Sequence, residues 1–330
     1  MALLGRHPDN EGRRFYVDHL VNGRLSVEQF LTQLTASAEF ADKALRWTST
    51  PDHDRAIEAV LAQPSVRHLS LRLASHAVAP TEAFDRALAS RNLPFDRVSG
   101  QADYAREHRR RFHELFLAVR TLTESSASPG ILEFGPGLFS TLYESLCPGC
   151  RLVFADRPTP SIDESFEPIL RPLMSSAIEF VEVDLLGDLD AAAPVLDRFG
   201  PFDLVVFTEV LEHLARHPAE VLAFLLDRLT PRGVLYLTTP NALGRSKLRI
   251  IKRGRNPQQM YPRRGDNVDA HHHVREYSMV ELIEAVQEAG GQVRALHFST
   301  CWDDPQELDS LRERPAESGN LVLVAGRASC

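Results

Sequence analysis

Cysteine is scarce in this chain: its 330 residues include four. So few cysteines do not form the disulfide framework of a small secreted domain. No apolar run approaches the roughly 20 residues that a membrane-spanning helix needs. The N-terminus also lacks the charged-then-apolar pattern of a secretory leader, because Arg6, Asp9 and Glu11 interrupt it. These absences predict a cytoplasmic protein without a membrane span.

Basic residues are outnumbered, with 37 Lys and Arg against 45 Asp and Glu, which gives a formal net charge of −8. This balance argues against a general nucleic-acid binder. The cations are unevenly spread, and residues 245–264 hold eight of them with no acid: Arg245, Lys247, Arg249, Lys252, Arg253, Arg255, Arg263 and Arg264. The segment predicts either an anionic partner, such as a phosphate, a uronate or RNA, or a solvated amphipathic helix.

An apolar stretch at residues 131–137 runs directly into a glycine-rich turn. Gly135 and Gly137 can adopt positive φ and allow close approach of a ligand, while a following helix would present free N–H groups. Glu133 at the end of the strand would repel a pyrophosphate and favour a cationic amino-acid ligand. Ser140 also replaces the third glycine of the dinucleotide motif. The turn therefore predicts a nucleotide site that is not a dinucleotide site.

Two further strands are expected to end in acids. Residues 151–155 form an apolar strand that ends in Asp156, and an acid there can bind both ribose hydroxyls of a nucleoside. Residues 177–183 form a third strand followed by Asp184 and Leu185, a pair suited to the edge and face of an adenine. The alternative is that both acids are turn residues that merely end strands.

Two later strands are expected at 202–207 and 234–238. The first runs into the segment 208–213, with sequence Thr-Glu-Val-Leu-Glu-His, and the second ends in Thr-Pro-Asn at 239–241. Because ligands bind at the carboxyl ends of strands in open α/β sheets, both segments are candidates for the active site.

In this order the motifs resemble the class I S-adenosylmethionine (SAM) dependent methyltransferases over residues 101–330. The resemblance implies an α/β fold: a Rossmann-like seven-stranded sheet with helices on both faces, preceded by a smaller all-helical region. It also implies SAM as the cofactor. The cofactor-binding residues it implies are Glu133, Gly135, Gly137, Asp156, Asp184, Leu185 and Thr208.

Methyl transfer needs an aligned nucleophile and a group that removes its proton. The segments 209–213 and 271–277 are expected to meet at the sheet edge. They supply His213, His272 and His273 as candidate bases for a hydroxyl acceptor, with His271 as a further neighbour. The alternative is that each is an ordinary exposed or capping histidine.

A divalent metal is a second interpretation of the same residues. The spacing of Glu209 and Glu212 would put both carboxylates on one helical face beside His213. The pattern resembles small-RNA 3′-terminal 2′-O-methyltransferases, which implies Glu209, Glu212, His213 and His273 as ligands of Mg²⁺ or Mn²⁺ that hold two vicinal hydroxyls. Metal-free relatives carry the same run, and there Glu212 and His213 orient the loop beside SAM.

Three regions are expected along the chain. Residues 1–45 are similar to a small helical module, marked by L-x-G-R-x-P-D-x-x-G, that occurs beside bacterial surface-protein and glycan-assembly domains. Residues 46–100 are interpreted as a helical linker or cap. Residues 101–330 form the methyltransferase domain, with 243–270 as a basic lid or substrate segment. The Cys-x-x-Cys pair at 147–150 is interpreted as structural.

The segments 239–241, 254–257 and 273–282 are similar to bacterial methyltransferases encoded with polysaccharide and glycolipid assembly. The resemblance implies O-methylation of a hydroxyl on a saccharide or glycoconjugate, and the basic segment suggests an anionic acceptor. The alternatives are an RNA ribose 2′-O-methyltransferase, a natural-product tailoring methyltransferase and a non-catalytic SAM-binding scaffold.

Overall fold

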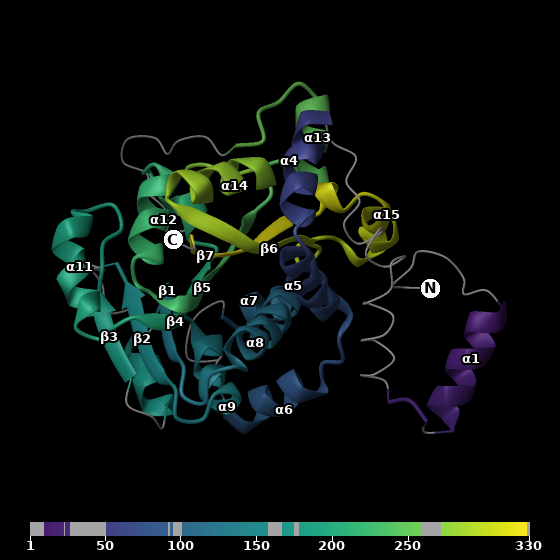
Figure 1. Ribbon diagram of the computed structural model, residues 1–330, viewed down its shortest axis with the longest axis horizontal. Helices are drawn as coiled ribbons and strands as arrows, with labels where there is room; N and C mark the ends of the chain where they lie inside the picture. The colour runs from purple at the N-terminus through teal and green to yellow at the C-terminus, as the bar shows by residue number, and fades with distance from the viewer. Residues whose placement is uncertain are drawn as a thin grey trace.

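A computed structural model describes residues 10–22, 24–26, 51–91, 93–94, 101–157, 167–174, 178–258 and 272–328. These residues contain one seven-stranded sheet with helices on both of its faces (Figure 1). The strand order is β3-β2-β1-β4-β5-β7-β6. The fold predicted from the sequence is thereby confirmed.

The strands are β1 (Gly130–Phe134), β2 (Arg151–Asp156), β3 (Ile178–Glu182), β4 (Phe202–Thr208), β5 (Leu229–Pro240), β6 (Gly291–Ser299) and β7 (Asn320–Arg327). The α-helices are α1 (Asn10–Val21), α4 (Pro51–Leu61), α5 (Pro64–Ala74), α6 (Glu82–Arg91), α7 (Gln101–Glu107), α8 (Arg109–Thr123), α9 (Tyr143–Leu146), α10 (Glu167–Leu170), α11 (Leu189–Asp197), α12 (Pro218–Leu226), α13 (Arg245–Lys252), α14 (Met279–Glu288) and α15 (Leu308–Glu313). Short 3₁₀ helices are η1 (Ser75–Val78), η2 (Leu138–Leu142), η4 (Arg171–Leu173), η5 (Leu211–His213), η6 (Pro305–Glu307) and η7 (Pro315–Glu317).

Strand direction brings the expected site segments to one edge of the sheet. β1 to β5 are parallel, and β7 is antiparallel to both β5 and β6. β6 therefore runs in the same direction as β5. The carboxyl ends of β1 to β6 and the first residue of β7 share one side of the sheet, which we call the ligand edge.

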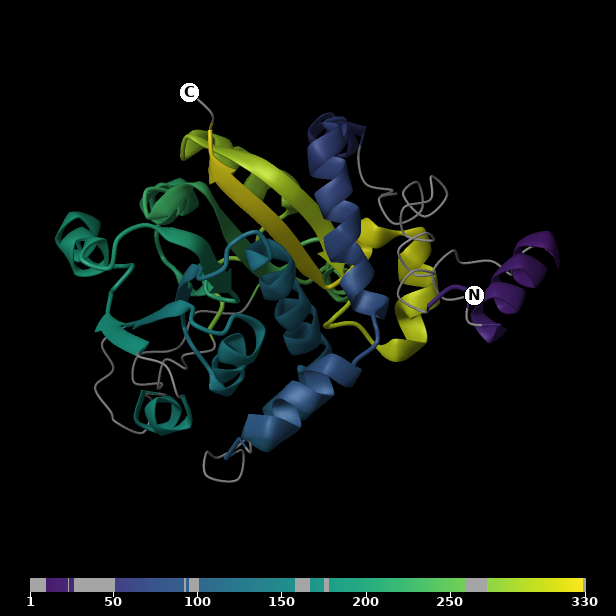
Figure 2. The same cartoon turned by 60° about the horizontal axis from the view of Figure 1, so that its bottom comes forward.

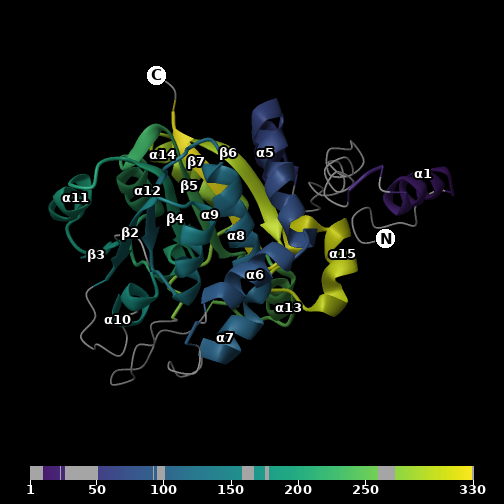
Figure 3. The same cartoon turned by 90° about the horizontal axis from the view of Figure 1, so that it is seen from below.

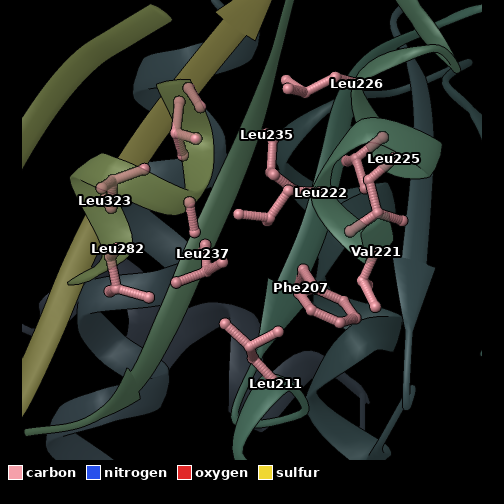
Figure 4. Packing of buried hydrophobic residues seen from close by; sticks show 14 of the residues in the cluster. Phe207, Leu211, Val221, Leu222, Leu225, Leu226, Leu235, Leu237, Leu282 and Leu323 are labelled. Atoms are coloured by element: carbon pink, nitrogen blue, oxygen red, sulfur yellow. The ribbon is translucent and has the colours of Figure 1, made fainter. Parts of the chain in front are cut away.

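Both faces of the sheet are covered by apolar helices. On one face, residues of α11, α12 and α14 form a continuous core with the strands. Figure 4 shows Leu222 and Leu225 of α12 beside Leu235 and Leu237 of β5 and Phe207 of β4. On the other face, α8, α9 and α10 pack on the sheet. The central strands read as apolar runs because helices bury them on both sides.

The segment before α7 packs on the sheet as well. Pro51 and Pro64 each begin a helix, where the missing proline N–H carries no penalty. α5 lies beside the edge strand β6 (Figure 2), and the N–H of Leu296 donates to Ser70 Oγ at 2.9 Å. The helix thereby covers one unpaired strand edge.

Several boundaries differ from the prediction. Two helices, α7 and α8, precede β1 and meet at His108, and the fifth strand is longer than expected. Ala177, from the expected third strand, lies outside the described residues, as do His271 and the segment 259–270. The same holds for most of the module expected at 1–45, of which α1 and the turn after it are described. Within the described residues, no helix has the length and apolar character needed to cross a membrane.

Candidate functional site

The glycine turn after β1 has the backbone that its sequence predicts. Gly135 has φ 67°, a conformation that favours glycine, and a Cβ placed on Gly137 would meet open space. A helix follows the turn as expected; it begins as the 3₁₀ helix η2 and continues as α9. Ser140 explains the tight turn, because its Oγ accepts a hydrogen bond from the Gly137 N–H at 3.0 Å.

Glu133 lies buried beneath this turn with one unsatisfied oxygen. Glu133 is only 4% exposed, and the Tyr143 hydroxyl donates to its Oε1 at 2.9 Å. Oε2 has no hydrogen-bond partner among the described residues. Burial raises the pKa of Glu133 to about 7. A buried oxygen of this kind is costly unless a ligand donates to it, and an ammonium group would do so.

The acids after β2 and β3 stand at the same edge. Asp156 is half-buried, burial raises its pKa, and Oδ1 accepts the Arg157 N–H at 2.8 Å. Asp184 is exposed, and its Oδ1 accepts the Leu186 N–H at 2.9 Å. The contact of Leu185 with an adenine stays a prediction: Leu185 is 5% exposed and packs in the core, whereas the neighbouring Leu186 is 49% exposed.

Glu209 does not lie on a helix as its spacing from Glu212 suggested. It has φ 56° and precedes η5, so the prediction that both carboxylates share one helical face is wrong. Its Oε1 accepts hydrogen bonds from Thr238 Oγ1 at 2.6 Å and from Asn320 Nδ2 at 3.0 Å. A left-handed backbone at a non-glycine residue costs about 1–2 kcal/mol, so β5 and β7 hold this turn in place.

Three of the four predicted metal ligands come together. One ligand atom each from Glu212, His213 and His273 lies within 4.8 Å of the others, and Glu209 is not in this group. Glu212 is 1% exposed, with Oε2 accepting from Thr239 Oγ1 at 2.8 Å and Oε1 without a hydrogen-bond partner among the described residues. Burial and the nearby charge of Glu209 raise the pKa of Glu212 well above its usual value.

The segment after residue 271 is held against η5 by its backbone. The N–H groups of Val274 and Arg275 both donate to the Glu212 carbonyl oxygen, at 2.7 and 3.1 Å. His213 Nδ1 lies 3.0 Å from the His272 carbonyl oxygen, and the rings of His213 and His273 are 4.9 Å apart. His272 thus contributes its backbone carbonyl oxygen to the contact with His213. These contacts place two distant histidines beside one buried carboxyl group.

His273 is oriented by a second acid. Its Nδ1 lies 3.0 Å from Glu276 Oε1, and Lys247 Nζ of α13 donates to the same oxygen at 2.7 Å. Burial raises the pKa of Glu276, but the bonds from His273 and Lys247 outweigh burial and hold it below its usual value. An ionised Glu276 that accepts from Nδ1 leaves Nε2 as the basic nitrogen of His273.

Arg111 of α8 is a site residue that sequence reasoning missed. It is 7% exposed, and its guanidinium donates to the Tyr104 hydroxyl at 2.7 Å. Burial lowers its pKa, yet Tyr104, Glu209 and Glu212 outweigh burial, and the net pKa is raised. The available signal was its spacing of four and eight residues from the apolar, buried Leu115 and Val119 of the same helix, because a charge on that face requires buried partners.

A small cavity with room for about one water molecule lies between α8 and the ends of β4, β5 and β7. Arg111, Thr208, Thr238, Cys301 and Asn320 are among the residues that line it. Thr208, the last residue of β4 and predicted to touch the cofactor, lines this cavity together with residues of β5 and β7.

The basic segment forms the amphipathic helix α13, and acids bind its first half. Arg245 pairs with Glu317 at 2.8 Å and Arg249 with Glu307 at 2.6 Å. Both acids belong to the insertion between β6 and β7, which we call the 300–319 insertion. Figure 3 shows α13 beside α15 of this insertion. The cysteines at 147 and 150 are free and buried, and burial raises both pKa values, in keeping with a structural role.

Comparison with known proteins assigns the family. A model of the family described as "Methyltransferase domain" matches residues 104–296, and a second model, "Domain of unknown function (DUF4214)", matches residues 1–44. None of the curated proteins matches the chain.

Solved structures with a similar fold include several methyltransferases. The N-methyltransferase NodS from Bradyrhizobium japonicum WM9 has 18% identity and a TM-score of 0.39, covering 66% of this chain and 96% of its own. Magnesium protoporphyrin IX methyltransferase from Synechocystis PCC 6803 with bound S-adenosylhomocysteine (SAH) has 14% identity and a TM-score of 0.43, covering 70% and 88%. The methyltransferase domain of bacterial CtHen1-C has 16% identity and a TM-score of 0.40, covering 65% and 97%.

The family model spans more than half of the chain and includes the glycine turn, the acids at the strand ends and the segment after β4. The chain therefore belongs to the SAM-dependent methyltransferases.

Proposed function

We propose that this methyltransferase transfers the methyl group of SAM to a hydroxyl of a saccharide or glycoconjugate. The observation that carries the proposal is the group formed by Glu212, His213 and His273 at the ligand edge. Its Glu212 and His213 follow β4, the strand next to β1, and Glu133 of β1 has an oxygen without a hydrogen-bond partner among the described residues, which suits it to an ammonium group. A hydroxyl acceptor needs such a base or metal site beside the methyl donor.

The cofactor side of the proposal uses the acids at the ends of β1, β2 and β3. Glu133 Oε2 would accept from the ammonium group of SAM, Asp156 would bind the ribose hydroxyls, and Asp184 with Leu186 would meet the adenine. When bound, SAM would supply the electrophilic methyl group. The open space at Gly137 leaves room for the methionine part.

The acceptor side has two arrangements. In the first, His273 takes the proton from the acceptor hydroxyl, with Glu276 fixing the ring through Nδ1. In the second, Glu212, His213 and His273 would hold a divalent ion, which would supply a binding site for two vicinal hydroxyls. Glu212 Oε1 fits the second arrangement, because it is buried, has no hydrogen-bond partner among the described residues and lies 3.8 Å from His213 Nε2. Two imidazoles and one carboxylate favour Mn²⁺ over the harder Mg²⁺.

The acceptor proposed here also carries an anionic group. Among the described residues, Lys252, Arg253 and Arg255 are exposed at the end of α13, and no ion pair is formed by them. Arg245, Lys247 and Arg249 are already paired with acids. A phosphate or uronate of the acceptor would therefore bind at the C-terminal end of α13. If α13 closed over the bound acceptor, it would act as a lid.

The test is SAM calorimetry with and without EDTA, followed by SAH release from a panel of sugars and sugar nucleotides. Each sugar with a vicinal diol is paired with its deoxy analogue, and Mg²⁺ or Mn²⁺ is added back. Turnover that needs both the diol and the ion supports the metal arrangement, while turnover in EDTA supports His273 as base. Turnover on an RNA oligonucleotide alone, with salt-dependent binding, would replace the saccharide by a ribose 2′-hydroxyl.

A further inference from the structure

The helix α13 presents its basic residues on two different faces. Arg245 and Arg249, four residues apart, pair with acids of the 300–319 insertion. Lys247 lies between them in sequence, and a helix turns by about 200° over two residues, so its side chain points away from the insertion. Its Nζ donates instead to Glu276 Oε1 at 2.7 Å. The helix therefore joins the insertion to the segment after residue 271.

Glu276 carries this contact on to His273. Lys247 Nζ and His273 Nδ1 share its Oε1, at 2.7 and 3.0 Å. Glu276 is buried, and a buried carboxylate is costly without a cation beside it. Among the described residues, Lys247 is the only lysine or arginine that forms an ion pair with Glu276. Without this ammonium group the carboxylate would lose the reason to stay in its buried position beside His273.

The backbone around Glu276 is fixed on both sides. Before it, two N–H groups donate to the Glu212 carbonyl oxygen. After it, the Tyr277 carbonyl oxygen accepts from the Ala242 N–H at 2.9 Å. These bonds fix the path of the chain but not the side-chain rotamers. The direction of the His273 ring therefore depends on side-chain contacts, among which the bond between Nδ1 and Glu276 is a directional one.

We propose that Lys247 is a positioning residue for methyl transfer: acting through Glu276, it fixes the direction of the His273 ring. The inference rests on the proposed function and gives α13 two separate roles. The middle of the helix, at Lys247, aligns the histidine, while its C-terminal end would bind the anionic group of the acceptor. Because Lys247 acts on alignment, its loss should affect the rate of transfer more than the binding of either ligand.

Kinetics of a charge-removing variant test this role. Lys247→Met removes the ammonium group and keeps a side chain of similar length. On a methylated saccharide we expect kcat to fall about 10- to 100-fold, with little change in the acceptor KM or in SAM affinity. Lys247→Arg should restore most of the rate, since it replaces the cation. An unchanged kcat in Lys247→Met would overturn the inference.

Arg249→Met is the matched control, because it breaks an ion pair two residues further along the same helix. Exposed ion pairs contribute little to stability, so this variant should turn over like the parent protein. Equal losses of kcat in Arg249→Met and Lys247→Met would assign the effect to general support of α13 and would also overturn the inference.

A double variant tests whether Lys247 acts through Glu276. Glu276→Gln keeps the shape of the side chain and removes the charge that pairs with Lys247. If the lysine acts through this carboxylate alone, adding Lys247→Met to Glu276→Gln should lower kcat little further. A loss in the double variant equal to the product of the two single losses would show independent action and contradict the proposal.

A measurement without turnover keeps this inference separate from the proposed function. With the histidines labelled with ¹⁵N, the ring signals of His273 are identified by their loss in His273→Ala. They should shift in Lys247→Met and stay in place in Arg249→Met. If they shift in this way but no saccharide is methylated, the positioning role stands and the proposed function fails. If Lys247→Met methylates a saccharide with the kcat of the parent and leaves these signals in place, the positioning role is wrong and the proposed function stands.

Discussion

The two halves of the ligand edge are built in different ways. In the cofactor half, β1, β2 and β3 each end in or beside one acid, and these acids follow one another along the chain: Glu133, Asp156 and Asp184. In the acceptor half, the ends of β4, β5 and β6 are combined with α8, α13 and the segment after residue 271. Its charged groups come from parts of the chain that are far apart in sequence.

The difference concerns burial as well as distance along the chain. In the cofactor half Glu133 is buried but Asp156 and Asp184 are partly or fully open to solvent, whereas in the acceptor half Glu212 is 1% exposed and interacts with the charge of a buried arginine, Arg111. Among the described residues, buried polar atoms without hydrogen-bond partners include Glu133 Oε2 in the cofactor half and, in the acceptor half, one oxygen each of Glu209 and Glu212 and the Arg111 Nε. Such atoms are costly in the ligand-free protein and become favourable when a ligand satisfies them.

The largest effect is expected from the acceptor half. His273→Ala should lower methyl transfer by about 10²–10⁴-fold, because the chain loses its base or one of its metal ligands. The measurement is SAH release at saturating SAM.

His217→Ala is the matched control, since His217 is half exposed and lies 3.9 Å from Glu288, away from the group. It should retain normal turnover. Full activity in His273→Ala would mean that His213, and not His273, is the base or metal ligand. It would also contradict the assignment of His273 to the acceptor half of the ligand edge.

An intermediate effect is expected from the cofactor half. Asp156→Ala should weaken SAM by about 1–3 kcal/mol through lost hydrogen bonds to the ribose, as measured by calorimetry. Glu179→Ala removes an exposed acid from β3 and serves as the control. Equal affinity of both variants and the parent would mean that Asp156 only ends its strand.

The smallest effect is a dependence of SAM affinity on pH. Because burial raises the pKa of Glu133 to about 7, the carboxyl is neutral below that pH and ionised above it. The ammonium of SAM prefers the ionised form, so affinity should rise with pH by up to about tenfold per unit below pH 7 and then level off. Glu133→Gln keeps the side-chain shape and should remove this rise. The same pH profile in both proteins would assign the effect to another group.

The cofactor half was largely predictable from the sequence, because each acid follows an apolar strand and parallel strands bring their carboxyl ends together. The burial of Leu185 was not predictable. An alternating pattern could not tell which of two adjacent leucines is turned to solvent, and the core holds Leu185 while Leu186 is exposed.

The acceptor half was predictable only as a set of residue types. The spacing of Glu209 and Glu212 suggested a helix, but bonds from Thr238 and Asn320 hold Glu209 in a left-handed turn. Neither Asn320 on β7 nor Arg111 on α8 carries a local motif. Their role depends on the antiparallel placement of β7 and on charge pairs between distant segments, which one sequence does not reveal.

The division of the edge is tested most directly by titrating SAM into the parent protein, Asp156→Ala and His273→Ala in parallel by calorimetry. We predict that the affinity falls in Asp156→Ala and is unchanged in His273→Ala, because the two residues serve different ligands. An equal loss in both variants, or a loss in His273→Ala alone, would contradict the assignment of SAM to β1, β2 and β3 and of the acceptor to the histidine group.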